Sequence, residues 1–309
     1  MSTTTIKGNT VPRTIEPRHV RFNFKETPVR WVPNDATSSH IMNAMSLLFP
    51  AGELWFCRVY NRAMPFITDP KLRADADGFL RQEVLHSRSH NTVIKYFTEE
   101  LKIDVSGFIK ITDFIFKKML DKKPFGLPFG GESRFWLRHQ LGIISALEHF
   151  FSYAGQWVIE ANALDEANAD PVMLDLLRWH GTEEVEHRRV AYDIYQHLGG
   201  SYFERCLLMV VTVPLLLYLL IKGCGFMFKK DTAPGKPRSV VLGWIASAKQ
   251  GRLPGLWTSI KHCFDYFRPS FDPGSIGDFQ VALDYFAKSP AVQAAQHGGN
   301  WVFDGKKAA

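Results

Sequence analysis

Apolar residues recur at helical spacing over much of the chain. From residue 38 to about 200 the pattern predicts four long helices, and the alternation typical of strands is scarce. Asp69-Pro70 and Asp170-Pro171 each join an N-cap residue to a proline suited to the first helical position, so they predict the starts of the second and fourth helices. Gly199-Gly200 predicts that the fourth helix ends near 198.

The other long helices carry weaker boundary signals. Ser38 or Ser39 can cap the first helix, in which Pro50 either makes a kink or restarts the helix. The third helix is expected from about 132 to 162, and a shorter helix precedes it at about 106–121. Four long helices with short or moderate connections predict an all-α fold, a four-helix bundle with additional C-terminal helices.

The sequence outside the bundle differs in pattern. Four prolines in the first 36 residues predict an extended N-terminal arm. The chain therefore divides into an arm at 1–36, the bundle at 37–200, an apolar helix at 201–230 and a C-terminal helical extension at 231–309. Within the extension, short helices are expected at about 240–249, 256–267 and 278–288.

The apolar helix leaves three alternatives open. The run from Cys206 to Ile221 contains no charged residue and, past Lys222, extends to Phe228. A membrane-spanning helix needs about 20 apolar residues, and Pro214 lies in the middle of this borderline run. The segment is a helix packed on the bundle, a segment at or in a membrane surface, or a single span. The basic residues that follow suit anionic lipid headgroups and equally suit a solvated loop.

Composition narrows the class of protein. With 46% hydrophobic and 22% charged residues the chain is globular. The net charge of +6 is modest, and no Lys/Arg stripe is interleaved with aromatic residues, which argues against binding to nucleic acid. The four cysteines form no CxxC pair and the N-terminus shows no secretory signal. We therefore expect reduced thiols and a cytoplasmic protein, with peripheral attachment to the cytoplasmic membrane left open.

Glutamate and histidine recur at metal-ligand spacing on the predicted helices. His180, Glu184 and His187 are spaced i, i+4 and i+7, so they share one face of the fourth helix. Glu83 and His86 form a simpler copy on the second helix. Two imidazoles and a carboxylate on one face make half of a site for iron, manganese or zinc.

The first and third helices each add one acid on an apolar face, Glu53 and Glu148. The order Glu, Glu-x-x-His, Glu, Glu-x-x-His is that of two-metal sites in helical bundles. So many acids inside an apolar bundle would be costly unless they were ionised against metal. A third match, from Glu16 to His19, lies in the proline-rich arm and is expected to be accidental. The candidate ligands are Glu53, Glu83, His86, Glu148, His180, Glu184 and His187.

This set resembles the ligands of ferritin-like di-iron carboxylate proteins, most closely the p-aminobenzoate N-oxygenase type. That type has an additional histidine ligand four residues before the last glutamate, which here is His180. The resemblance covers about 38–200. The Phe-Pro-x-Gly-Glu and Glu-Glu-x-Glu-His segments are also similar to a bacterial family described as predicted metal-dependent hydrolases.

The resemblance implies a ferritin-like bundle that holds two iron ions, with manganese or zinc as alternatives. It implies a non-haem di-iron oxidoreductase that uses O2 and an external electron donor to hydroxylate, N-oxygenate or desaturate an organic substrate. The apolar helix suggests that this substrate is lipophilic and that the protein contacts a membrane surface; a homodimer is a further expectation. The alternatives are a hydrolase with a metal-bound water, and a metal-storage or structural protein. The residues expected nearest to the chemistry are Glu53, Glu83, Glu148, His180 and Glu184.

Polar residues beside the ligands have simpler interpretations. His90 is expected to support the site or to lie in the core rather than to bind metal. Glu183 and Glu186 flank the ligand face, so each is expected to face solvent or to hold a metal-bound imidazole. His149 points away from the ligand face and is expected to be structural.

Overall fold

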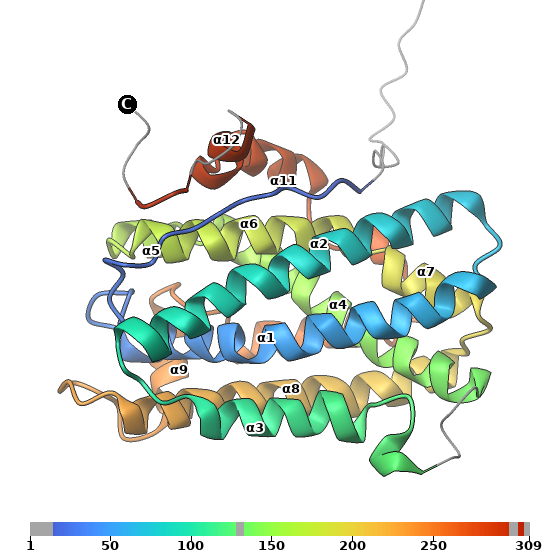
Figure 1. The fold of residues 1–309 in the computed structure, drawn as a ribbon, viewed down its shortest axis with the longest axis horizontal. Helices are drawn as coiled ribbons and strands as arrows, with labels where there is room; N and C mark the ends of the chain where they lie inside the picture. Colours follow the sequence, from blue (N-terminus) through green and yellow to red (C-terminus); the bar gives the residue numbers. More distant parts are fainter. Residues whose placement is uncertain (1–14, 128–132, 297–301, 306–309) are drawn as a thin grey trace, which may run out of the picture.

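The computed structural model describes residues 15–127, 133–296 and 302–305, and the all-α prediction is confirmed over these ranges (Figure 1). Helix α1 packs along α2, and α4 packs along α6, so that two helix pairs enclose one core. These are the four long helices of the predicted bundle. Their bounds are Ala36–Ala63 for α1, Pro70–Lys95 for α2, Arg134–Glu160 for α4 and Pro171–His187 for α6.

Capping residues set where the bundle helices begin. Asp69 and Asp170 cap α2 and α6 as predicted, each followed by proline at the first helical position. The predicted cap of α1 was wrong, because the N-cap is Asp35, whose carboxylate accepts hydrogen bonds from the backbone N–H and the hydroxyl of Ser38. Pro50 lies inside α1, which continues across it.

The fourth predicted helix is interrupted near its end. α6 ends at His187, and α7 (Val190–His197) begins after two arginines. Arg188 lies over the ring of Phe279, and Arg189 pairs with Asp272, so both arginines contact the C-terminal extension. The pattern of apolar residues did not reveal this break, because the apolar spacing continues across it.

The remaining helices surround the bundle. α3 (Ser106–Phe114) continues into a π-helical turn, η3 (Ile115–Met119), and both lie against α1. The predicted C-terminal pieces are present as α9, α10 and α11, whereas α5 and α12 were not expected. Their bounds are Asn162–Glu166 for α5, Val240–Lys249 for α9, Leu256–Asp265 for α10, Phe279–Phe286 for α11 and Pro290–Gln296 for α12.

Helix α8 (Tyr202–Lys230) contains the apolar run and packs against α1 and α4 (Figure 1). It is long and apolar enough to cross a membrane by length and composition, and 39% of its most apolar window is buried. Met209, Val213 and Leu220 lie in the core, whereas Phe203 and Leu207 are exposed. One side of α8 therefore packs into the core, and the other side exposes apolar side chains on the protein surface.

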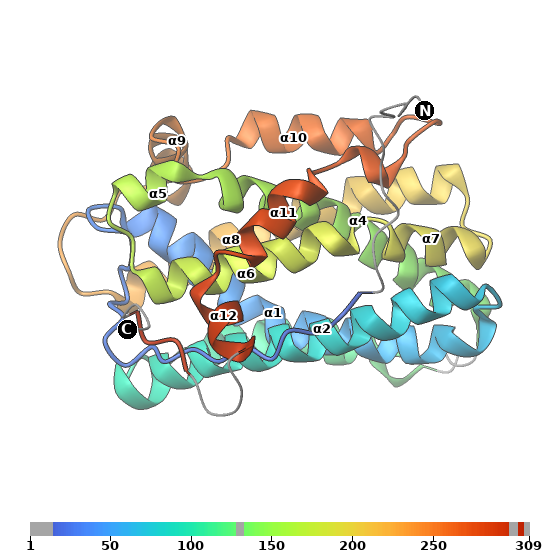
Figure 2. The ribbon, with the colours of Figure 1, turned by 90° about the horizontal axis from the view of Figure 1, so that it is seen from above.

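The described part of the N-terminal arm, residues 15–35, is extended and runs beside α2 and α6, beneath α11 (Figures 1 and 2). Phe24, Trp31 and Val32 are buried in the core. The arm also forms an isolated parallel bridge between Phe22 and Phe303. The arm is thus part of the packing and lies over the helices that carry most of the candidate ligands.

Candidate metal centre

All seven candidate ligands meet inside the bundle, and each of their side chains is buried. Their ligand atoms form two groups, and within each group the atoms lie within 4.8 Å of one another. We call these the first group and the second group. The first group consists of Glu53, His86 and His180, and the second consists of Glu83, Glu148, Glu184 and His187.

Glu184 and Glu83 connect the two groups. In the first group, the Nε2 atom of His180 lies 2.7 Å from Oε1 of Glu184, and Nδ1 of His86 lies 3.7 Å from the same oxygen. In the second group, Nδ1 of His187 lies 3.4 Å from the other oxygen of Glu184 and 3.2 Å from Glu83. Glu83 also lies 3.8 Å from His86. Both carboxylates therefore stand where they could bridge two cations.

Several ligand atoms have no hydrogen-bond partner. Both oxygens of Glu53, Glu83 and Glu148 are buried and unpaired by hydrogen bonds, as are one oxygen of Glu184 and the Nδ1 atoms of His86 and His187. Leaving a buried polar atom unsatisfied costs about 1–3 kcal/mol, and more for a charged group. Nine such atoms in one place fit metal ions as their partners. Four carboxylates would balance the charge of two divalent cations.

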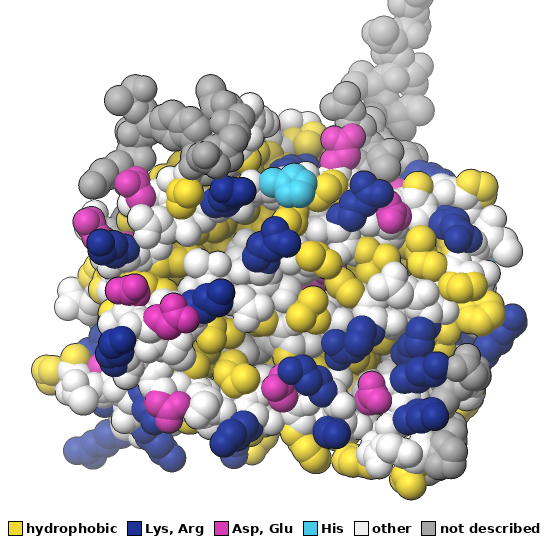
Figure 3. Space-filling model, viewed as in Figure 1, with side chains coloured by type: hydrophobic (Ala, Val, Ile, Leu, Met, Phe, Trp, Pro, Cys, Tyr) yellow, Lys and Arg dark blue, Asp and Glu magenta, His cyan; other side chains and the backbone are white. Residues whose placement is uncertain are grey.

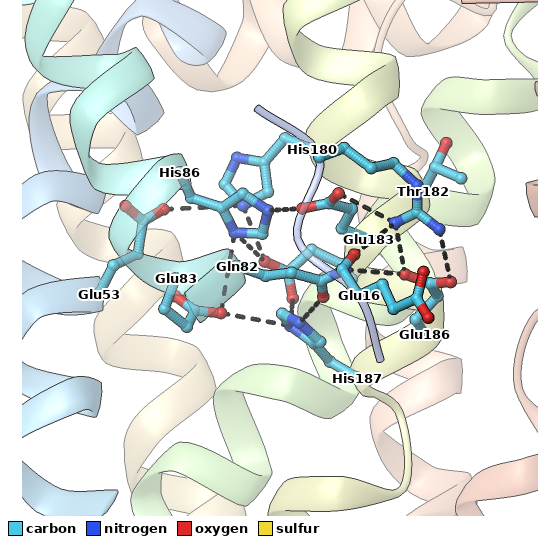
Figure 4. Close-up of polar contacts among 12 residues, drawn as sticks. Glu16, Glu53, Gln82, Glu83, His86, His180, Thr182, Glu183, Glu186 and His187 are labelled. Carbon is cyan, nitrogen blue, oxygen red and sulfur yellow. Dashed lines mark hydrogen bonds and ion pairs between the residues drawn. The ribbon is translucent and has the colours of Figure 1, made fainter. Parts of the chain in front are cut away.

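The second ring nitrogen of each candidate histidine contacts a neighbouring side chain, and Figure 4 shows this for His86 and His187. Nε2 of His86 lies 2.8 Å from a carboxylate oxygen of Glu183, and Nε2 of His187 lies 2.7 Å from the amide oxygen of Gln82. Gln82 directly precedes the motif of α2 and contacts the histidine of α6, whereas Glu183 directly precedes the motif of α6 and contacts the histidine of α2. Such partners fix the ring orientation and the tautomer of a metal-binding histidine.

His180 is supported by a third histidine. Its Nδ1 atom lies 2.7 Å from Nε2 of His90, whose other nitrogen lies 3.1 Å from the hydroxyl of Ser46. His90 therefore supports the site rather than joining a ligand group, which was one of the two roles expected for it. His149, expected to be structural, lies 2.9 Å from the backbone oxygen of His262.

Arg18 of the N-terminal arm contacts two of the acids beside the ligands. Its guanidinium donates to Glu183 at 3.0 Å and to both oxygens of Glu186 at 2.8 and 3.0 Å. Glu186 in turn accepts a hydrogen bond from Gln82 at 2.9 Å. The Glu-x-x-His match from Glu16 to His19 therefore supplies no ligand, as expected. Its Arg18 instead pairs with Glu183 and Glu186, the acids behind His86 and Gln82.

The sequence profile of a family described as predicted metal-dependent hydrolases matches residues 16–277. The chain belongs to this family. The match extends beyond the four bundle helices to the arm with Arg18 and to α8, α9 and α10. No curated protein and no solved structure matches the chain. Membership of the metal-dependent hydrolase family, expected from two short segments, is confirmed.

Burial and mutual repulsion act on the ligand carboxyls of this protein. Burial raises the pKa of Glu83 to about 7 and, with repulsion from neighbouring carboxylates, raises the pKa values of Glu53 and Glu148 well above the ordinary range. Burial acts the same way on Glu184, but its hydrogen bond with His180 and its ion pair with His187 outweigh burial and hold the pKa of Glu184 well below its usual value. Two cations would favour the ionised form of all four acids.

Two apolar cavities reach the metal centre from different sides. A cavity of about 170 Å³ lies between α8 and η3 and touches Glu53 and Glu184. A second cavity, of about 70 Å³, lies between α1, α4 and α9 and touches His180 and Glu184. Phe49 and Phe151 line both cavities. The other four candidate ligands line neither of these cavities, so the centre is accessible at Glu53 and His180 of the first group and at Glu184 of the second.

Sequence reasoning missed Gln82 and Arg18 and left Glu183 undecided. The sequence did contain a signal for Gln82 and Glu183, since each stands directly before a Glu-x-x-His motif on its helix. Adjacent helical residues point about 100° apart, so a periodicity argument assigns these two residues to a different face. No local signal marks Arg18, because its partners lie 165 and 168 positions away.

Proposed function

We propose that this protein is a two-metal enzyme that oxidises an apolar organic substrate with O2. Membership of a metal-dependent family and the two ligand groups support a metal-dependent enzyme. The observation that carries the oxidation is the chemistry of the two cavities. They meet the ligands only at Glu53, His180 and Glu184, and their other walls are almost entirely apolar.

The seven ligands would hold two iron ions, with manganese or zinc as alternatives. When bound, iron would supply O2 activation and would require an external electron donor. The chain itself orients the ligands through Glu183, Gln82 and His90. Its phenylalanine-lined cavities exclude water and leave room for a hydrocarbon beside the first group.

The apolar walls argue against a carbonyl substrate. A hydrolase stabilises the charge that develops on a carbonyl oxygen with N–H groups, cations or metal. Apart from the ligands, the larger cavity offers one polar side chain, the hydroxyl of Thr212. In the smaller cavity the indole N–H of Trp244 donates to the backbone oxygen of Pro254. These walls suit O2 and a C–H or amine substrate better than an ester.

Hydrolysis by water activated at the metals is the second candidate. It is favoured by the description of the family to which the chain belongs. Hydrolysis would proceed without O2 and with redox-inactive zinc, whereas oxidation needs O2 and a redox-active metal such as iron.

The test is to load the metal-free protein with Fe(II), Mn(II) or Zn(II) under anaerobic conditions, to measure metal content, and to expose it to O2 with a reductant. We expect about two ions per chain, a change in visible absorption on exposure to O2, and O2 uptake that Glu184→Ala abolishes. p-Nitrophenyl butyrate is offered in parallel without O2. Zinc alone at one ion per chain, or ester hydrolysis that Glu184→Ala abolishes, would overturn oxidation in favour of hydrolysis.

A further inference from the structure

The exposed side of α8 is a continuous apolar stripe. Phe203, Leu207, Val210 and Tyr218 are each more than half exposed. Their spacing of three to eight residues places them on one face of the helix, together with exposed Val211 and Pro214. Contiguous exposed apolar patches of this kind mark interaction sites, because leaving them in water costs free energy.

The segment beside this stripe is rich in basic residues. α3 lies beside α8 at the bottom of Figure 1, where Phe108 and Phe226 pack together and Lys230 lies 3.5 Å from Asp104. The segments 101–123 and 202–230 contain ten Lys and Arg, of which Arg205 is buried, but four Asp and Glu, an excess of six positive charges. This equals the net charge of the whole chain. Lys and Arg side chains line the lower part of the view in Figure 3, over α3 and the end of α8.

The larger cavity connects this face with the metal centre. Val211 and Leu215, both exposed on α8, line its outer part, and Phe116 and Met119 of η3 lie across from them. Glu53 of the first group lines the inner part of the same cavity. An apolar molecule that entered beside α8 would therefore reach the metal centre without crossing a polar layer.

We propose that the face formed by α8, α3 and η3, the docking face, binds an anionic lipid bilayer. The cavity behind α8 then takes an acyl chain from the bilayer to the metal centre. An apolar stripe bordered by lysines fits this occupant, because side chains such as Phe203 enter the acyl region while ammonium groups meet the headgroups. The acyl-chain part rests on the proposed function, whereas docking does not.

Docking is tested by flotation of the metal-loaded, full-length protein. The vesicles contain phosphatidylcholine alone, or phosphatidylcholine with phosphatidylglycerol. We expect flotation with the anionic vesicles and loss of flotation at high salt. Replacing Phe203 with serine and both Leu207 and Val210 with asparagine should lower binding at least about tenfold.

The control replaces Leu54 and Val84, which are exposed apolar residues on α1 and α2, with asparagine. It should float like the parent protein, and circular dichroism and metal content confirm that both variants fold. Equal loss in the two variants, or no flotation of the parent protein, would show that docking is wrong. A dimer that the triple substitution dissociates would show instead that the docking face joins two copies of the chain.

Entry of an acyl chain is tested with cis-parinaric acid, whose fluorescence rises in apolar cavities. Leu215→Trp narrows the outer part of the cavity and should weaken binding at least about tenfold. Leu207→Trp, on the same helix but outside the cavity, should leave binding unchanged. Equal affinity in both variants would overturn the acyl-chain part.

Neither flotation nor parinaric acid binding depends on turnover, so the proposed oxidation and the proposed docking can fail separately. A protein that floats and binds parinaric acid but takes up no O2 contradicts the proposed oxidation alone. A protein that takes up O2 but floats with neither vesicle contradicts docking alone.

Discussion

The two ligand groups differ in how they are enclosed. The first group, with Glu53 and His180, lies beside both apolar cavities. The second group lines neither cavity except through Glu184, and its histidine is fully buried behind Phe79, at 4.4 Å between ring centroids. Glu53, His180 and the connecting Glu184 are thus placed to meet a substrate, whereas the rest of the second group is enclosed by protein.

The supporting contacts set His180 apart from the other two candidate histidines. His187 is supported by Gln82, which is connected through Glu186 to the arginine of the arm. His86 of the first group is supported by Glu183, which pairs with the same arginine. His180 instead contacts His90, whose own partner is a neutral hydroxyl. We infer that substitutions in the second group act on metal retention, and substitutions of His180 act on reactivity.

Glu184→Ala should have the largest effect, because Glu184 is the one candidate ligand that touches both groups and both cavities. We expect the affinity for both metals to fall more than about 100-fold, beyond the range for supporting residues. Metal analysis after gel filtration measures this. Glu160→Gln, an exposed acid at the end of α4, is the control. Retention of one tightly bound ion would show that the groups are independent.

His180→Ala and His187→Ala should separate reactivity from retention. His180→Ala should reduce O2 uptake more than about 100-fold while less than about half of the metal is lost. His187→Ala should lose the metal of the second group. His149→Gln controls for changing a buried histidine outside both groups. Equal loss of metal and uptake in His180→Ala would mean that His180 is only a structural ligand.

Arg18→Ala should have a smaller effect. Burial raises the pKa of Glu183 to about 8 even with the arginine beside it, so removing Arg18 favours the neutral acid, which supports His86 less well. We expect metal affinity to fall about 10–100-fold. Competition with a chelator measures it, and Arg21→Ala, exposed on the same arm, should change nothing. An unchanged affinity in Arg18→Ala would refute this role for the arm.

The smallest effect concerns pH in the metal-free protein. The folded pKa values of Glu83 and Glu183, about 7 and about 8, lie above their unfolded values, so these protons stabilise the fold at low pH. That stability is lost as pH rises through 7 to 8, where histidines of ordinary pKa are already neutral in the unfolded chain.

We expect the Tm of the metal-free protein to fall by about 3 °C between pH 7 and 8.5. Bound metal should flatten this slope, because cations hold the same acids ionised. Thermal unfolding followed by circular dichroism measures both forms. A Tm of the metal-free protein that rises between pH 7 and 8.5 would contradict the raised pKa values of Glu83 and Glu183.

The sequence by itself determined the helices and the ligand types. Apolar periodicity placed the bundle helices, and the Asp-Pro pairs located the starts of α2 and α6, because capping and helical spacing are local properties. Five of the seven candidate ligands could be named because Glu and His at i, i+3 and i+4 must share a helix face. The other two, Glu53 and Glu148, could be named as single acids on the apolar faces of the remaining helices.

Only the tertiary structure decided how these ligands are divided and supported. Glu83 and His86, adjacent on one helix face, fall into different groups, because each pairs across the core with residues of α6. Arg18 reaches Glu183 across 165 positions, which no local pattern encodes. The two sides of α8 were likewise undecided, since an apolar helix has the same sequence whether it faces a core or a membrane.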